Sequence, residues 1–419
     1  MKLSKNKILI IILAIFIIIA GIIIWKVIEN QSFTTLHNKG IKCYKKGNYD
    51  KAIRYYQKAI DLDDDDDDTY VYSSMGIAYS GKGNYDKAIE CYQKALLLNY
   101  KQTLNNNYSD IYSDIYYNMG NAYTNKKNYD KAIECYQRAI ELNYYYAEAY
   151  GGIGNAYLYK KNYDKAIEYY KKNIELKPND ADIHNNMGSA YRSKGNYDKA
   201  IECYKKAIEL KTNFAEPYFN MGNAYANYDN GYDKTIECYQ KAVELNPNYV
   251  DAYNNMGQAY GEKGNNDKAI ECFKKIIELN PYYVNAYYCM GLVYKNKGNY
   301  DKAIEYFEKT IELNPNDAYA YYIMGNVYYK KSNYSKVIEC CQKAIELKID
   351  DAVGAYNNMG IAYVQKNNYE KGIECFEKVI ELKSDFEDAY YNMGAAYQLL
   401  GNKKKADYYY KKAKELENK

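Results

Sequence analysis

Histidine, tryptophan and proline are scarce in this chain of 419 residues, which holds 2 His, 1 Trp and 5 Pro. Only His37 and His184 could supply imidazole, and the 10 cysteines include no C-x-x-C pair. Zinc, haem and iron–sulfur sites need clustered histidine or cysteine ligands at fixed spacings, so the sequence excludes them. We therefore expect no metal and no cofactor.

The chain also lacks an excess of charge of either sign. Lys and Arg together number 57 and Asp and Glu 54, which gives a net charge of +3. Without a basic excess, we expect no nucleic acid partner. No nucleophile–base set or phosphate-binding loop, of the kind that a catalytic domain needs, is present. The sequence thus indicates neither an enzyme nor a small-molecule substrate.

One long apolar run stands at the N-terminus. Residues 8–25 contain no polar side chain, and they follow Lys2, Lys5 and Lys7. At 1.5 Å per residue a helix of this length spans about 27 Å, close to the bilayer core of about 30 Å. A cleaved signal peptide has a shorter apolar region and a small-x-small cleavage site, neither of which is present. We expect a cytoplasmic N-terminus and transmembrane anchor at 1–28, followed by a linker at 29–32.

The lysines before this run predict the orientation of the anchor. By the positive-inside rule they place the N-terminus in the cytoplasm and the rest of the chain outside it, as in a single-pass membrane protein. Lysines between residues 39 and 46 weaken this asymmetry, and ten unpaired thiols fit an oxidising compartment poorly. The alternative, with the rest of the chain facing the cytoplasm, therefore stays open.

The remainder of the chain repeats itself. One local pattern recurs around a glycine at intervals of mostly 34 or 35 residues: Gly40, Gly76, Gly120, Gly154, Gly188, Gly222, Gly257, Gly291, Gly325, Gly360 and Gly394. Tyrosine commonly stands four before and three after the glycine, a small residue twelve after, and an aromatic sixteen after. These spacings are helical, and a K-G-N or K-K-N turn separates the two halves, so each repeat is a helix–turn–helix. One such hairpin cannot bury its apolar faces alone, so neighbours must stack.

This framework resembles the tetratricopeptide repeat, with eleven copies between about residues 33 and 413. The resemblance implies an all-α fold, namely a right-handed α-solenoid of about eleven helix–turn–helix repeats after one N-terminal transmembrane helix. It also implies a concave groove, lined by the first helix of each repeat, that binds other proteins. We expect repeats one and two at 33–102, an insertion at 103–112, repeats three to eleven at 113–414, and a tail at 415–419.

Asparagine marks the candidate binding surface. Amides recur two residues before the repeat glycine and one after it, positions that share one helix face. Stacked repeats would turn them into a ladder that can pair with the backbone of an extended peptide. Tyrosines three before the glycine should face the same groove as contact residues. The candidate site comprises Asn118, Asn121, Asn155, Asn186, Asn220, Asn223, Asn255, Gln258, Asn326, Asn358, Asn392, Tyr117, Tyr288, Tyr322 and Tyr391.

Other interpretations of these features remain. The amides could instead reflect codon bias and hydrogen bonds between helices. Six of the ten cysteines lie fifteen residues after the repeat glycine and Cys238 lies sixteen after it, and all seven are predicted to be small core residues. We predict a membrane-anchored protein–protein interaction scaffold that binds extended peptide segments in the groove. The alternatives are a non-catalytic structural spacer and a carbohydrate-binding solenoid, and the sequence carries no signal for or against self-association.

Overall fold

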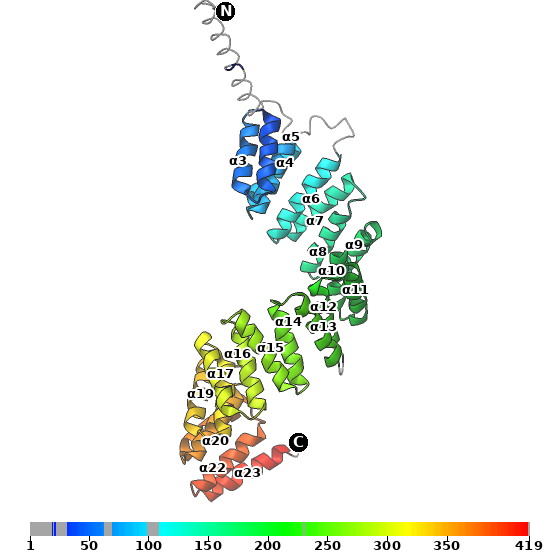
Figure 1. Ribbon diagram of the computed structural model, residues 1–419. Helices are drawn as coiled ribbons and strands as arrows, with labels where there is room; N and C mark the ends of the chain where they lie inside the picture. The colour runs from blue at the N-terminus through cyan, green and yellow to red at the C-terminus, as the bar shows by residue number, and fades with distance from the viewer. Residues whose placement is uncertain are drawn as a thin grey trace, which may run out of the picture. The chain divides into compact units, whose positions relative to one another are not determined.

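The described part of the chain is entirely helical. The computed structural model describes residues 19, 21, 32–62, 69–98, 109–228 and 231–417. Within these ranges the chain forms 22 α-helices and no strand (Figure 1). The predicted anchor at 8–25 lies outside the described residues, apart from Ile19 and Gly21. Among the helices that are described, none is long and apolar enough to cross a membrane.

The helices alternate as first and second helices of eleven repeats. The first helices are α2 (Phe33–Tyr44), α4 (Thr69–Gly81), α6 (Ser109–Asn125), α8 (Ala147–Tyr159), α10 (Ala181–Ser193), α12 (Ala215–Tyr225), α14 (Val250–Glu262), α16 (Val284–Asn296), α18 (Ala318–Lys330), α20 (Ala352–Gln365) and α22 (Glu387–Leu399). The second helices are α3 (Tyr49–Ile60), α5 (Tyr85–Leu98), α7 (Tyr129–Leu142), α9 (Tyr163–Leu176), α11 (Tyr197–Leu210), α13 (Tyr232–Leu245), α15 (Asn266–Leu279), α17 (Tyr300–Leu313), α19 (Tyr334–Glu346), α21 (Tyr369–Leu382) and α23 (Lys403–Glu417). The chain thus forms an all-α solenoid, as predicted.

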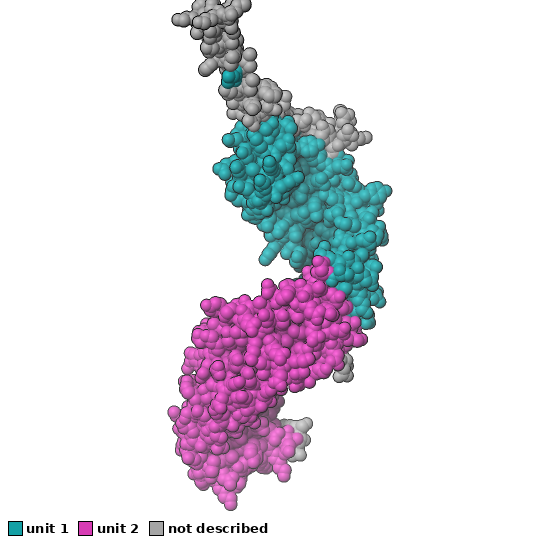
Figure 2. Space-filling model, in the orientation of Figure 1, with its two compact units in different colours: residues 1–212 teal, residues 213–419 magenta. Residues whose placement is uncertain are grey.

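The helices fall into two compact units, residues 1–212 and 213–419 (Figure 2). Repeats one to five belong to the first and repeats six to eleven to the second. Each compact unit is built from the same helix pairs, and neighbouring pairs within it share hydrophobic cores. In the first compact unit, for example, Ile133 and Tyr136 of α7 pack in one cluster with Ile153 of α8.

A glycine and an aromatic ring set the distance between the two helices of a repeat. A Cβ atom at Gly154 would lie 2.5 Å from a ring carbon of Tyr170, and one at Gly120 would lie 2.6 Å from Tyr136. Non-bonded carbon atoms do not approach that closely, so only glycine leaves room for the aromatic ring. Tyr170 is completely buried at this contact. The two helices therefore approach closely at the glycine, with the ring sixteen residues after it as the contacting group.

The turn between the paired helices follows from its sequence. Its middle residue has a positive φ, as at Gly195 (76°), a conformation that glycine adopts without strain. The next residue is an asparagine N-cap: the Asn196 side chain accepts a hydrogen bond from the backbone N–H of Lys199, which satisfies an otherwise unpaired donor. This turn begins the second helix at the same residue in almost every repeat.

Ion pairs join seven of the second helices to the turn of the following repeat. An aspartate in the first turn of the second helix contacts a lysine 30 to 40 residues later. The pairs are Asp50–Lys82, Asp86–Lys126, Asp130–Lys160, Asp164–Lys194, Asp233–Lys263, Asp267–Lys297 and Asp301–Lys331. Because these side chains are exposed, each pair contributes about 0–1 kcal/mol.

The predicted insertion at 103–112 does not interrupt stacking. Helix α6 begins at Ser109, so the last residues of that segment are helical. Ile89 and Tyr92 of α5 share a hydrophobic cluster with Ile115 and Met119 of α6, which joins repeats two and three. Ile111 and Tyr112, which belong to the predicted insertion, also pack against this cluster.

Replacing the repeat glycine should be costly only where a ring faces it. Gly154→Ala forces Tyr170 to move in a packed core, which costs about 1–3 kcal/mol. Gly325→Ala is the matched control, because Cys341 replaces the aromatic ring there and the nearest atoms lie 3.3 Å and 3.4 Å away. We expect faster amide hydrogen exchange in α8 and α9 for Gly154→Ala and little change in α18 and α19 for Gly325→Ala. Equal effects at the two positions would contradict this account of the glycine.

Candidate functional site

The predicted amides lie on first helices of the repeats, on one face that we call the ladder face. It is defined by the residues two before and one after each repeat glycine, from Asn118 on α6 to Asn392 on α22. Most of these side chains are half-buried, whereas Gln258 is exposed and Asn220 is only 8% exposed. The ladder face is therefore neither fully solvated nor part of the core.

Hydrogen bonds between neighbouring repeats connect the amides. The amide two before the glycine donates to the amide oxygen one after the glycine of the preceding repeat. These bonds are Asn186 Nδ2 to Asn155 Oδ1 (3.0 Å), Asn255 Nδ2 to Asn223 Oδ1 (3.0 Å) and Asn358 Nδ2 to Asn326 Oδ1 (2.7 Å). The side chains predicted to form a ladder thus form real bridges, and the bridges hold adjacent first helices together.

Core tyrosines donate to the same oxygens. The Tyr170 hydroxyl donates to Asn155 Oδ1 over 2.8 Å, and Tyr136 and Tyr239 donate to Asn121 and Asn223 over 2.7 Å. Burial raises the pKa of Tyr170 above its ordinary value, so the hydroxyl keeps its proton and remains a donor. Because a carbonyl oxygen has two lone pairs, the two donors saturate Oδ1 of Asn155 and of Asn223.

The NH₂ groups of these amides, unlike their oxygens, are not saturated by hydrogen bonds. Within the described ranges, Nδ2 of Asn155 and Nδ2 of Asn223 donate to no protein acceptor. The bridges fix the orientation of both amides, since rotating either one would place donors against donors. Each of these two amides therefore presents its N–H bonds in a defined direction within its own compact unit.

Several predicted residues depart from the bridge pattern. Asn392 donates to Asn357 (3.2 Å), because Ile361 occupies the position one after the glycine in repeat ten. Gln258 forms a hydrogen bond with the Cys289 thiol. Asn118 follows a repeat that carries Ile77 at the bridging position, so no amide bridge can form there.

Three of the tyrosines predicted to contact a ligand pack against other aromatic rings of the protein. The ring of Tyr117 lies 5.8 Å from that of Tyr136, Tyr288 lies 5.8 Å from Phe307, and Tyr391 lies 5.4 Å from Tyr410. Each thus covers the aromatic residue of its own repeat. Tyr322 instead forms hydrogen bonds with Asn326 and Asp351. Only Tyr391, which is 59% exposed, presents most of its ring to solvent.

The cysteines are core residues, as predicted. All ten are free thiols, and all except Cys43 are buried. Burial raises the pKa of Cys375 to about 12, and neighbouring Glu374 adds to this shift. Thiols with such values stay protonated at physiological pH and are poor nucleophiles.

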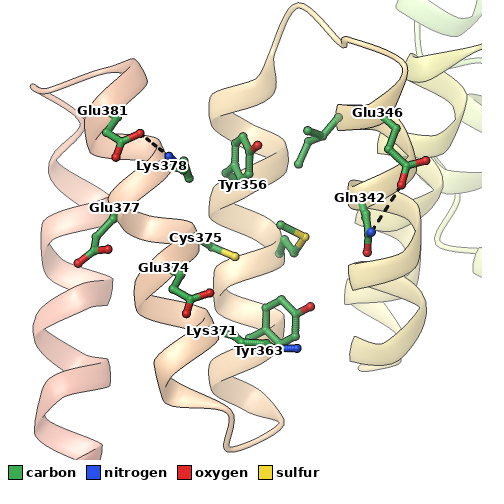
Figure 3. A pocket seen from close by; sticks show the side chains of 12 residues that line it. Gln342, Glu346, Tyr356, Tyr363, Lys371, Glu374, Cys375, Glu377, Lys378 and Glu381 are labelled. Carbon is green, nitrogen blue, oxygen red and sulfur yellow. Dashed lines mark hydrogen bonds and ion pairs between the residues drawn. The ribbon is translucent and has the colours of Figure 1, made fainter.

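Sequence reasoning missed one surface altogether. A cavity of about 630 Å³ lies between α19, α20 and α21, and none of the predicted site residues lines it (Figure 3). Its signal is a departure from the repeat pattern, with glutamate at a position that usually holds glutamine or lysine.

Family models match nearly every repeat. A tetratricopeptide repeat model matches residues 113–143, 147–180, 250–283, 284–317 and 318–351. A second model, described as TPR repeat, matches 188–229, 227–264 and 360–401. Further tetratricopeptide repeat models match 31–97, 169–202 and 387–419.

The chain belongs to the tetratricopeptide repeat family. Among solved structures it is similar to MamA, at 36% identity over 41% of this chain and 93% of that one, with a TM-score of 0.38. It is also similar to YrrB, titled a TPR protein with an unusual peptide-binding site, at 26% identity over 45% and 96% of the two chains, with a TM-score of 0.39. A repeat protein of Cytophaga hutchinsonii is 23% identical over 60% and 97%, with a TM-score of 0.47. No curated protein sequence matches the chain.

The bridge between a core tyrosine and a ladder amide should be measurable as a coupling energy. Asn155→Ala leaves the buried Tyr170 hydroxyl unsatisfied, which costs about 1–3 kcal/mol, whereas Tyr170→Phe costs about 1 kcal/mol. The double variant should be more stable than the sum of the two predicts, because with both partners removed no buried tyrosine hydroxyl is left unsatisfied. Gln258→Ala is the control, since Phe273 has no hydroxyl in the equivalent repeat. Additive effects at Asn155 and Tyr170 would show that the bridge contributes nothing.

Proposed function

We propose that this tetratricopeptide repeat protein is a protein–protein interaction scaffold that binds extended peptide segments along the ladder face. The observation that supports the proposal is the hydrogen bonding of the Asn155 and Asn223 amides. Their oxygens are saturated by a tyrosine and a neighbouring amide, while their NH₂ groups have no acceptor among the described residues.

An extended peptide suits a row of oriented donors. Its backbone presents a carbonyl oxygen at every residue, so successive amide NH₂ groups can each donate to one of these oxygens without regard to side-chain sequence. Each hydrogen bond contributes about 0.5–1.5 kcal/mol. Because the amides are already held in place by their bridges, binding costs little further side-chain entropy. The half-covered tyrosines beside them, and exposed Tyr391 above all, supply apolar contact.

Asparagine-to-aspartate substitution separates binding from folding. Asn155→Asp with Asn223→Asp keeps the oxygen that accepts the bridge and replaces the NH₂ donors with an anionic oxygen that repels peptide carbonyls. Asn143→Asp with Asn246→Asp is the matched control, because both accept hydrogen bonds through Oδ1 in loops between repeats. We expect binding of a peptide selected from a random displayed library to weaken about tenfold or more in the ladder pair and to be unchanged in the control pair.

The experiment uses the full chain in lipid nanodiscs, with fluorescence anisotropy as the readout and circular dichroism as the check on folding. Unchanged binding by the ladder pair would overturn the proposed site. If no peptide is selected and a glycan array retains the protein, carbohydrate binding replaces peptide binding as the function. If neither ligand class binds, the structural spacer is the remaining function.

We also propose that residues 8–25 anchor the scaffold in a membrane, on the strength of the uninterrupted apolar run between lysines. The full chain should stay in the membrane fraction after alkaline carbonate washing, and deletion of 8–25 should release it. Protease added outside spheroplasts should digest the repeats and spare an N-terminal tag. Digestion only after lysis would instead place the repeats in the cytoplasm, and release of the full chain by carbonate would refute the anchor.

A further inference from the structure

The cavity in the second compact unit differs in chemistry from the ladder face. It has a volume of about 630 Å³ and is formed by repeats nine and ten (Figure 3). Helix α20 contributes Tyr356, Met359 and Tyr363, which are apolar or aromatic, and α21 contributes the Cys375 thiol. Carboxylates from α19 and α21 also line the cavity, together with Lys371 and Lys378 of α21.

The cavity depends on cysteine at one repeat position. Fifteen residues after the repeat glycine, four repeats carry tyrosine, and in repeats four, eight and eleven it stacks on the tyrosine three after the glycine. The stacked pairs are Tyr157–Tyr169 (5.7 Å), Tyr294–Tyr306 (5.4 Å) and Tyr397–Tyr409 (5.4 Å). Repeat ten carries Cys375 instead, so no aromatic ring from this position stacks on Tyr363, and the Lys371 ammonium lies over its ring.

A second departure makes the cavity acidic. Seventeen residues after the glycine (eighteen in repeat six) the chain has glutamine or lysine in nine repeats and glutamate only at Glu308 and Glu377. Repeat eight has the bulky Tyr306 at the position of Cys375, next to Glu308. Only repeat ten therefore combines a small cysteine with the extra carboxylate. A cavity of about 470 Å³ beside α9 has Lys171, Lys172 and Lys194 in balance with its acidic residues.

Two of the carboxylates are not neutralised. Lys378 pairs with Glu381 over 2.7 Å, and the Lys371 ammonium lies 5.6 Å from the centre of the Tyr363 ring. In the described part of the chain, neither Glu374 nor Glu377 forms an ion pair or a hydrogen bond. Burial raises the pKa of the Cys375 thiol to about 12, so the thiol is neutral and the negative charge comes from the carboxylates.

We propose that this cavity, the arginine pocket, binds an arginine side chain of a protein partner. A guanidinium group stacks on aromatic rings and on methionine sulfur while its N–H groups pair with carboxylates, and the pocket places both kinds of group together. The carboxylates of Glu374 and Glu377 are the two hydrogen-bond acceptors, and Tyr356, Met359 and Tyr363 form the floor. The arginine pocket lies apart from the ladder face and requires no ligand there.

The natural repeats supply a substitution that should close the pocket. Cys375→Tyr places a ring on Tyr363 as Tyr306 does on Tyr294, in a position that holds tyrosine in four repeats. Cys135→Tyr makes the same change in repeat three and is the matched control. Glu374→Gln with Glu377→Gln removes the free carboxylates without changing the shape, and as an exposed pair it does not threaten folding.

The probe is acetylated tri-arginine amide, with tri-citrulline amide as its uncharged isostere, added to the full chain in nanodiscs. Binding is followed by the ¹³C-methyl signal of Met359, which Met359→Leu identifies. We expect tri-arginine to shift this signal and tri-citrulline to leave it in place. Affinity should fall about tenfold in Cys375→Tyr and in the double glutamine variant, stay unchanged in Cys135→Tyr, and weaken with added salt.

Several results would overturn the proposal. Equal effects of the two probes would show that charge is not recognised, and an unmoved Met359 signal would place any binding elsewhere. Undiminished affinity in the double glutamine variant would exclude the carboxylates even if Cys375→Tyr did not fold. Self-association of the chain that tri-arginine does not disrupt and Cys375→Tyr abolishes would assign the cavity to a second copy instead.

Discussion

The contact between a glycine and an aromatic ring is the constraint on which the rest of the structure depends. In ten of the eleven repeats the ring of a residue on the second helix rests on the glycine of the first, closer than any Cβ would allow. That contact fixes the separation of the paired helices and buries the largest side chains of the core. Repeat nine, with Cys341 in place of the ring, has the same fold because its neighbours supply the stacking that one hairpin cannot.

This core contact also reaches the surface. A tyrosine ring that lies on Gly154 or Gly222 extends far enough for its hydroxyl to meet the asparagine one residue after that glycine. The amide oxygen then accepts a second bond from the following repeat. One oxygen therefore links the core of a repeat, the ladder face and the next repeat, so the orientation of the amide is set by folding. Repeats with phenylalanine in place of tyrosine lack this link.

Most of the fold could be predicted because it depends on local pattern. The spacing of Gly154, Tyr157 and Tyr170 predicts two helices and their contact face, and the asparagine in each turn predicts where the second helix begins. The state of the amides could not be predicted, because Asn155 and Asn186 are 31 residues apart and their bridge depends on stacking. The sequence predicted that the amides share one helix face and left open whether they bond to each other or to a ligand.

The same limit explains why the arginine pocket was missed. Cysteine fifteen residues after the glycine occurs in most repeats, so the repeat pattern predicts an ordinary core residue at this position. Its effect depends on a second position, where Glu377 replaces glutamine or lysine, and on the helix of the preceding repeat. Neither residue is informative by itself.

A repeat array gains two kinds of surface from this arrangement. Positions that every repeat shares form a uniform face, which suits the uniform backbone of a peptide but cannot distinguish one peptide sequence from another. Discrimination between partners must come from positions where a single repeat differs from the others, because only there does the array offer a unique combination of groups. Cys375 with Glu377 is such a combination. A scaffold built this way can bind many peptides weakly through the positions that its repeats share, and can discriminate between protein partners through the positions where one repeat differs.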